Sequence, residues 1–248
     1  MENLINDELK VYRGKDYIVN DKISIHQPSL GEIDDYGEQA YFNMIYDFTA
    51  VPADMMWQLD EIGVDYTKIN DFELFSTVIF SKYTKNDTCI LFGNDLDLKQ
   101  FSHCMFKDTN EPVLYDEKSG IIIDEYTYCI IVNTLRKIHG LKRNNQFPGN
   151  ETTRRILIDD AKNEYLLNKD KEYHSQLKSL ISTMINSPGF KYDHENVWDM
   201  KINAFMDSVK RITKMKETDL LLQSGYSGFG IDLSKLNKEQ LNWKGELE

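Results

Sequence analysis

A chain of 248 residues with 41% hydrophobic and 12% aromatic side chains is long and apolar enough for one large core or two modest ones, which excludes a disordered protein. No apolar run approaches the roughly 20 residues of a membrane-spanning helix, and the first residues lack the apolar region of a signal peptide. The net charge of −12 does not favour binding to nucleic acid or to an anionic membrane.

The start of the sequence predicts a β-hairpin followed by a helix. Residues 17–19 and 23–25 are short β-prone runs on either side of an Asn-Asp-Lys turn signal. A helix is expected over residues 30–49, and Ser29 and Glu32 have the spacing of a capping box at its start. This helix combines acidic and aromatic residues, which is typical of a helix packed on one side and negatively charged on the other.

Two further short helices are expected before residue 84. Pro52 predicts the beginning of the first, which ends at Gly63. Asn70 or Asp71 is expected to cap the second, whose apolar stripe extends over residues 72–83.

The middle of the chain changes to short β-prone runs with a turn signal at residues 116–120. The strand candidates are residues 89–92, 101–106, 113–115 and 121–123. From this change we expect an α+β fold that is predominantly helical, with a small antiparallel sheet in the middle of the chain.

Helical patterns account for most of the remaining sequence. Asp124 is expected to cap a helix that ends at Gly140, a polar loop follows over residues 141–149, and Asn150 caps the next helix. Two more apolar stripes span residues 177–185 and 197–212.

The uneven charge suggests where the chain divides. Residues 1–125 hold 25 acidic and 10 basic side chains, whereas residues 126–248 hold 16 and 19. We therefore expect an acidic N-terminal region, residues 1–125, and a helical C-terminal region, residues 126–248, which form either separate units or one continuous domain. The acidic region can attract a basic protein partner, although solubility alone also explains such a charge.

No known motif for catalysis or for cofactor binding occurs with the spacing and the sequence context that it requires. Neither a phosphate-binding loop nor a dinucleotide-binding motif occurs, and Phe229 stands where a Gly-x-Ser-x-Gly motif around Ser227 needs glycine. His103-Cys104 has no second pair at zinc spacing, and the three cysteines are expected to be buried free thiols. We expect no catalytic residues, no metal and no cofactor.

A basic cluster flanks the polar loop at residues 141–149. Its members can contact phosphates, or they can be solvated helix ends, as the sparse flanking aromatic residues favour. The cluster consists of Arg136, Lys137, Lys142, Arg143, Arg154 and Arg155.

Three stretches together resemble a family of phage proteins, the tail assembly chaperones encoded in tail-gene modules of phages that infect Gram-positive and gut bacteria. The stretches are residues 25–38 (IHQPSLGEIDDYGE), residues 62–75 (IGVDYTKINDFELF), and residues 174–192 (HSQLKSLISTMINSPGFKY) with Leu241-Asn242-Trp243. The resemblance covers nearly the whole chain and carries no catalytic residues.

The resemblance implies a non-enzymatic protein of the host cytoplasm that binds apolar helices of the tape-measure protein, assists assembly of the tail-tube protein and is absent from the mature virion. A structural virion component, such as a connector or baseplate piece, has a similar composition, and a small phage enzyme or host-modulating protein is a third interpretation. The sequence leaves open whether the chain forms a homo-oligomer.

The candidate partner-binding residues come from two segments that offer large apolar side chains. Met adapts to varied apolar partners, although core packing is the competing interpretation for the two methionines, and Trp57 lies off their stripe. The candidates are Met55, Met56, Trp57, Tyr226, Phe229 and Trp243.

Overall fold

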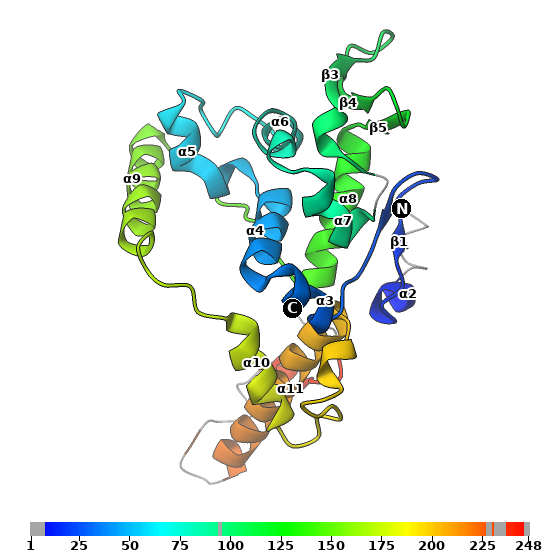
Figure 1. Cartoon of the computed structure of the whole chain (residues 1–248). Coiled ribbons are helices and arrows are strands. Elements are labelled where there is room, and N and C mark those ends of the chain that lie inside the picture. Colours follow the sequence, from blue (N-terminus) through cyan, green and yellow to red (C-terminus); the bar gives the residue numbers. More distant parts are fainter. Residues whose placement is uncertain (1–7, 94–95, 227–229, 231–236, 246–248) are drawn as a thin grey trace.

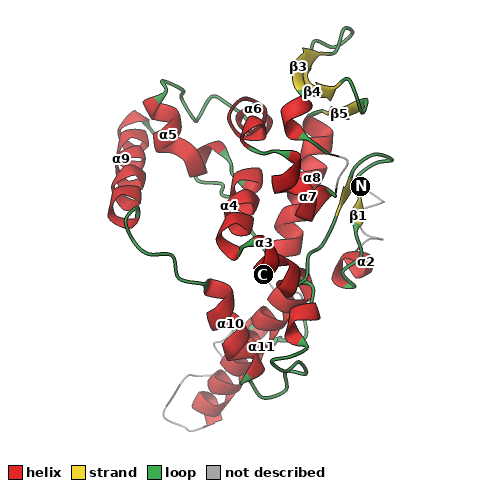
Figure 2. Ribbon diagram, in the orientation of Figure 1, coloured by secondary structure: helices red, strands yellow, loops and turns green. Residues whose placement is uncertain are grey.

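Helices dominate the computed structural model, which describes residues 8–93, 96–226, 230 and 237–245. The chain is 58% helical and 8% strand, so the expected α+β, predominantly helical class is confirmed (Figure 2). Figure 1 shows the three-stranded sheet at one end of the molecule, α10 and α11 at the other, and α9 beside α5 at one side.

The N-terminal elements begin with a helix and a two-stranded hairpin, and short helices follow. They are α2 (Glu8–Tyr12), β1 (Tyr17–Ile18), β2 (Ser24–Ile25), α3 (Leu30–Tyr36), α4 (Glu38–Thr49), the 3₁₀ turn η1 (Pro52–Met55), α5 (Met56–Glu61), α6 (Asp71–Leu74), the π-helical turn η2 (Phe75–Ile79), the 3₁₀ turn η3 (Phe80–Lys82) and α7 (Lys85–Phe92).

The small sheet and the long helices make up the rest. They are the 3₁₀ turn η4 (Leu98–Gln100), β3 (Ser102–Met105), β4 (Pro112–Asp116), β5 (Ile121–Ile123), α8 (Glu125–His139), α9 (Glu151–Asn168), α10 (Gln176–Ile185), the 3₁₀ turn η5 (Val197–Asp199), α11 (Ile202–Tyr226) and the 3₁₀ turn η7 (Lys238–Leu241). The sheet has the order β3-β4-β5 and is antiparallel throughout.

Three expected elements differ from the structure. The helical stripe over residues 197–212 is divided into η5 and α11, because the backbone of Met200 is extended at ψ 128°. Residues 89–92 belong to α7 and not to a strand, because the side chains of Thr84 and Asp87 form a capping box just before them and Gly93 ends the helix at φ +64°. The helix expected over residues 30–49 is interrupted by Gly37, whose φ of +101° is unfavourable for other residues.

A single hydrophobic core crosses the boundary at residue 125. Tyr41 and Phe48 of α4, Leu135 of α8 and Phe205 of α11 are all buried in it. Inside this core the Tyr41 hydroxyl lies 2.6 Å from Nε2 of His139. Because Nδ1 of His139 donates to the carbonyl of Leu135 at 2.8 Å, Nε2 carries no proton and accepts from Tyr41.

The first stretch of the resemblance joins the N-terminal part of the chain to the segment before α11. The N–H of Leu30 donates to the carbonyl of Met200, and the N–H of Ile202 donates to that of Pro28, both at 3.0 Å. At Gly31 an added Cβ would lie 3.3 Å from the Trp198 carbonyl oxygen, so the close approach favours glycine.

Polar side chains reinforce this junction around the start of α3. Ser29 and Glu32 form the expected capping box, with bonds of 2.6 and 3.2 Å. Glu32 also lies 3.2 Å from Lys201, and His26 lies between Asp16 at 2.8 Å and Glu32 at 3.1 Å.

Acid is expected to weaken the junction through Glu32. Burial alone would raise the pKa of this carboxyl, but the Ser29 N–H and the Lys201 ammonium outweigh it and lower the pKa from 4.5 to about 2. Stability should therefore fall between about pH 4.5 and 2, because over this range the unfolded chain binds a proton that the folded chain does not. Glu32→Gln should reduce this acid sensitivity in denaturant titrations at pH 3 and 7. Asp35→Asn, on the same helix, should behave as the wild type does.

Candidate functional site

An apolar groove between α3 and α10 is the candidate binding site. Its volume is about 580 Å³, and the turn η5 closes one side of it. A groove of this size accepts side chains from one face of a helix. The residues that line it are Leu30, Asp34, Glu38, Ser175, Leu177, Lys178, Ile181, Ser182, Ile185, Asn186, His194 and Trp198.

Hydrogen bonds from two directions fix the start of α10 at the groove. The Ser175 hydroxyl caps the helix by accepting from the N–H of Lys178, and Oε1 of Glu38 accepts from the N–H of Leu177, both at 2.9 Å. Burial would raise the pKa of Glu38, but the N–H groups of Leu177 and Gln176 and the hydroxyls of Ser175 and Tyr173 outweigh it and lower the pKa. Glu38 therefore stays ionised and ties α10 to the start of α4.

The groove has an apolar floor and a polar rim. Leu30, Leu177 and Ile181 are buried at its floor, whereas Ile185 and Trp198 are half-buried. The Trp198 ring is held in place because its Nε1 donates to the His194 carbonyl at 3.0 Å. The exposed residues of the rim are Asp34, Lys178, Ser182, Asn186 and His194.

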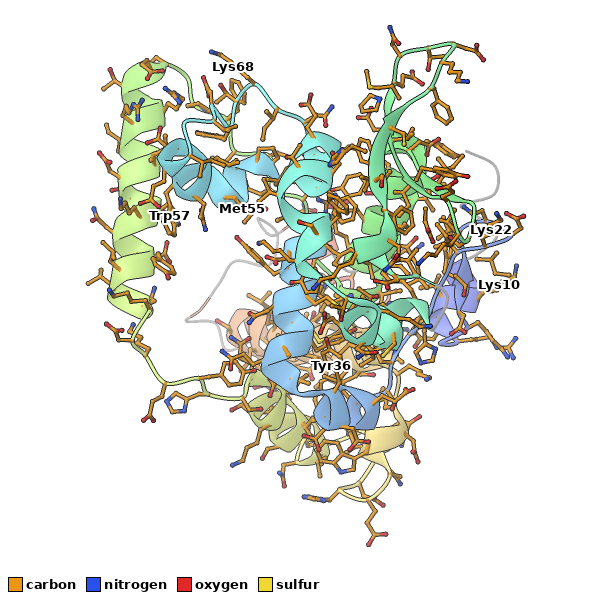
Figure 3. All side chains as sticks on the ribbon, turned by 45° about the horizontal axis from the view of Figure 1, so that its top comes forward. Lys10, Lys22, Tyr36, Met55, Trp57 and Lys68 are labelled. Carbon is orange, nitrogen blue, oxygen red and sulfur yellow. The ribbon has the colours of Figure 1, made fainter. Side chains whose placement is uncertain are left out.

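The candidates on η1 and α5 contribute to packing within the chain. Met55 and Met56 are buried in the core at 7% and 6% exposure, which leaves them almost no surface for a partner. Trp57 is half-buried, and its ring centroid lies 4.8 Å from that of Tyr165 on α9. Figure 3 shows Trp57 between α5 and α9, where it holds the two helices together.

The C-terminal candidates are separate from the groove. Tyr226, the last residue of α11, is 81% exposed. Trp243 is half-buried, its carbonyl accepts from Nη1 of Arg211 at 2.7 Å, and the ammonium of Lys244 lies 5.3 Å from its ring centroid. Phe229 lies outside the described residues.

Four members of the basic cluster contact acidic residues or carbonyls of the N-terminal region. Arg143 donates to both carboxylate oxygens of Asp71 at 2.8 and 3.0 Å, and Arg136 donates to the carbonyl of Thr49 at 2.7 Å. Arg154 and Arg155 pair with Asp65 and Asp60. Basic side chains of the C-terminal region thus bind acidic side chains and a carbonyl of the N-terminal region. No local sequence pattern indicates these contacts.

The described residues were expected to hold no metal site and to bury their cysteines. Among the described residues no group of three or more histidine, cysteine, aspartate or glutamate side chains is arranged to hold a metal ion. The expectation of buried thiols is wrong, because Cys89 and Cys129 are exposed at helix surfaces and Cys104 is half-buried at an edge strand of the sheet. No helix in the described part of the chain is both long and apolar enough to cross a membrane.

Comparison of the chain with protein-family models, with curated proteins and with solved structures gives no match. The groove itself combines residues from distant parts of the sequence. A signal for each wall was present, as the stripe at residues 177–185 and the helix start at Leu30, but nothing in the sequence indicated that the two would meet.

Proposed function

We propose that this chain is a non-enzymatic tail assembly chaperone that binds an apolar helix of the phage tape-measure protein in the groove between α3 and α10. One observation supports this proposal most strongly. Two of the three stretches that resemble such chaperones, residues 25–38 and 174–192, supply both walls of the groove. Segments far apart in the sequence thus meet at an apolar groove.

The geometry of the groove suits a helix better than an extended peptide. The floor offers aliphatic side chains and the Trp198 ring, and the described walls are helices and turns. Strand addition needs a free sheet edge, and none lies along the groove in the described residues, whereas an amphipathic helix needs only an apolar channel with a polar rim. Asp34 and Lys178 on the rim favour a partner helix that carries charges of both signs beside its apolar stripe.

In this proposal the chaperone covers the apolar stripes of the tape-measure chain in the host cytoplasm until the tail-tube protein surrounds that chain. The protein then leaves, so it is not part of the finished particle. Its fold needs no cofactor for this role, since apolar contact supplies the affinity.

The proposal predicts opposite results for two samples from infected cells. The tape-measure protein encoded in the same genome should co-purify with the tagged wild-type chain, and mass analysis of purified virions should not detect the chain. Stoichiometric presence in virions would instead support the structural-component interpretation. Wild-type chain that captures no tail protein would remove the chaperone function altogether.

A further inference from the structure

A second cavity, of about 510 Å³, lies on a different part of the surface from the groove. It lies where the segment before α6, the start of α8 and the loop after α8 meet, and a small organic molecule fits a cavity of this size. Its apolar walls are Val51, Pro52, Ala53, Ile69, Phe72 and Phe147, and its polar lining includes Tyr66, Asn70, Asp71, Glu125, Tyr128, Arg143 and Asn145.

The charges in the lining do not favour an anionic ligand. Arg143 is the only cation among the lining residues, and its guanidinium is already occupied. Nε and Nη2 donate to Asp71, while Nη1 donates to Oδ1 of Asn145 at 2.7 Å. Asp71 is neutralised by the same contact, and Nη2 of the buried Arg136, which does not line the cavity, lies 4.0 Å from its Oδ2 atom. Glu125 is exposed, and its carboxylate has no ion pair or hydrogen bond among the described residues, so it is the carboxylate of the lining that is left to pair with a ligand.

The start of α8 does not reverse this charge. The positive end of the helix dipole lies there, but the Asp124 side chain caps the helix by accepting from the N–H of Thr127 at 2.7 Å. With Asp124 as the cap, Glu125 is a second carboxylate at the same helix end, free to face a ligand.

Two tyrosines that line the cavity have buried hydroxyls without partners. Tyr66 and Tyr128 are 4% and 2% exposed, and neither hydroxyl has a hydrogen-bond partner in the described part of the chain. Burial raises the pKa of both phenols, so both remain neutral at pH 7. A buried hydroxyl without a partner costs about 1–3 kcal/mol, which an N–H donor of a ligand would recover.

We propose that this cavity binds an alkylammonium group attached to an apolar body, with Glu125 as the counter-ion, the phenol oxygens of Tyr66 and Tyr128 as acceptors, and Phe72 and Phe147 against the apolar part. Aromatic faces attract such cations, and the carboxylate at the mouth supplies the charge. The ammonium group comes either from a free amine or from a lysine side chain of a bound polypeptide. This site is independent of the groove between α3 and α10.

The probe is phenethylammonium, titrated into the full chain by calorimetry. Phenylacetate, which has the same ring but the opposite charge, is the control ligand and should not bind. Glu125→Gln should raise the Kd of phenethylammonium about tenfold, and Tyr128→Phe about threefold, as the loss of a charge and of a hydrogen bond. Glu164→Gln, on an exposed part of α9, is the control variant and should bind as the wild type does.

Weaker binding by the Glu125→Gln and Tyr128→Phe variants can be distinguished from unfolding. Glu125 is exposed, and Tyr128→Phe removes only a hydroxyl that has no partner, so both variants should keep the circular dichroism spectrum of the wild type. Nα-acetyl-lysine amide keeps its side-chain ammonium and is the second probe. If it binds more tightly than phenethylammonium, the source of the ammonium group is a lysine side chain, and if it binds more weakly, the source is a free amine. No binding of either probe at 10 mM, phenylacetate binding of equal strength, or an unchanged Kd in Glu125→Gln would overturn the proposal.

Discussion

Tyr41→Ala is expected to lower the free energy of unfolding by about 3–5 kcal/mol, because it removes a fully buried ring from the centre of the core. The substitution also leaves Nε2 of His139 without its donor, 2.6 Å away in the wild type. Tyr41→Phe separates these effects, since it keeps the ring and loses only the hydrogen bond. It should cost about 1–3 kcal/mol. Denaturant titrations of both variants check the two values.

The same pair makes a further acid-sensitive contribution. Burial lowers the pKa of His139 from 6.5 to about 4, although the hydrogen bond to the Leu135 carbonyl opposes this shift. Between about pH 6.5 and 4 the unfolded chain binds a proton at this residue and the folded chain does not. His139 therefore stabilises the fold fully above pH 6.5, and this contribution falls as the pH decreases towards 4.

A Tyr41→Ala variant as stable as the wild type would contradict this account of the core.

Ser182→Arg is expected to have the largest effect on binding. Ser182 is exposed on α10 and lines the groove, so a long charged side chain there occupies the channel without disturbing the core. Binding of the tape-measure helix should weaken at least tenfold, since the charge must be displaced or buried against apolar residues. Fluorescence anisotropy with labelled helices from the tape-measure protein measures the change.

Ser179→Arg is the matched control for this experiment. Ser179 lies on the same helix and is also exposed, but it does not line the groove. Its variant should bind as the wild type does, and thermal unfolding should be the same for both variants. Equal weakening by the two substitutions would indicate a general charge effect and would contradict the role of the groove.

Local signals in the sequence predicted much of the fold. Ser29, Asn70, Asp124 and Asn150 cap helices as expected, because a cap depends on residues three positions apart. Residues 89–92 were predicted as a strand, since a short apolar run fits a buried strand and a buried helix equally well. The capping box at Thr84 was the signal that distinguishes the two.

The candidate site was less predictable, because its parts meet only in three dimensions. Leu30 and Ile181 lie in opposite halves of the sequence, and both line the groove. The hydrogen bond from the N–H of Leu177 to Glu38 holds the start of α10 in this position. Trp57 was expected as a partner-binding side chain, but Tyr165 of α9 covers part of its ring. An amphipathic pattern identifies apolar side chains and does not reveal which of them another part of the chain will cover.

The most direct test of the central claim is photo-cross-linking from position 182 in phage-infected cells. A photoreactive residue at position 182 faces the groove, and the same residue at position 179 serves as the control. The account predicts cross-links to peptides of the tape-measure protein from position 182 and few or none from position 179. Equal labelling from both positions, or no tail protein cross-linked from position 182, would contradict it.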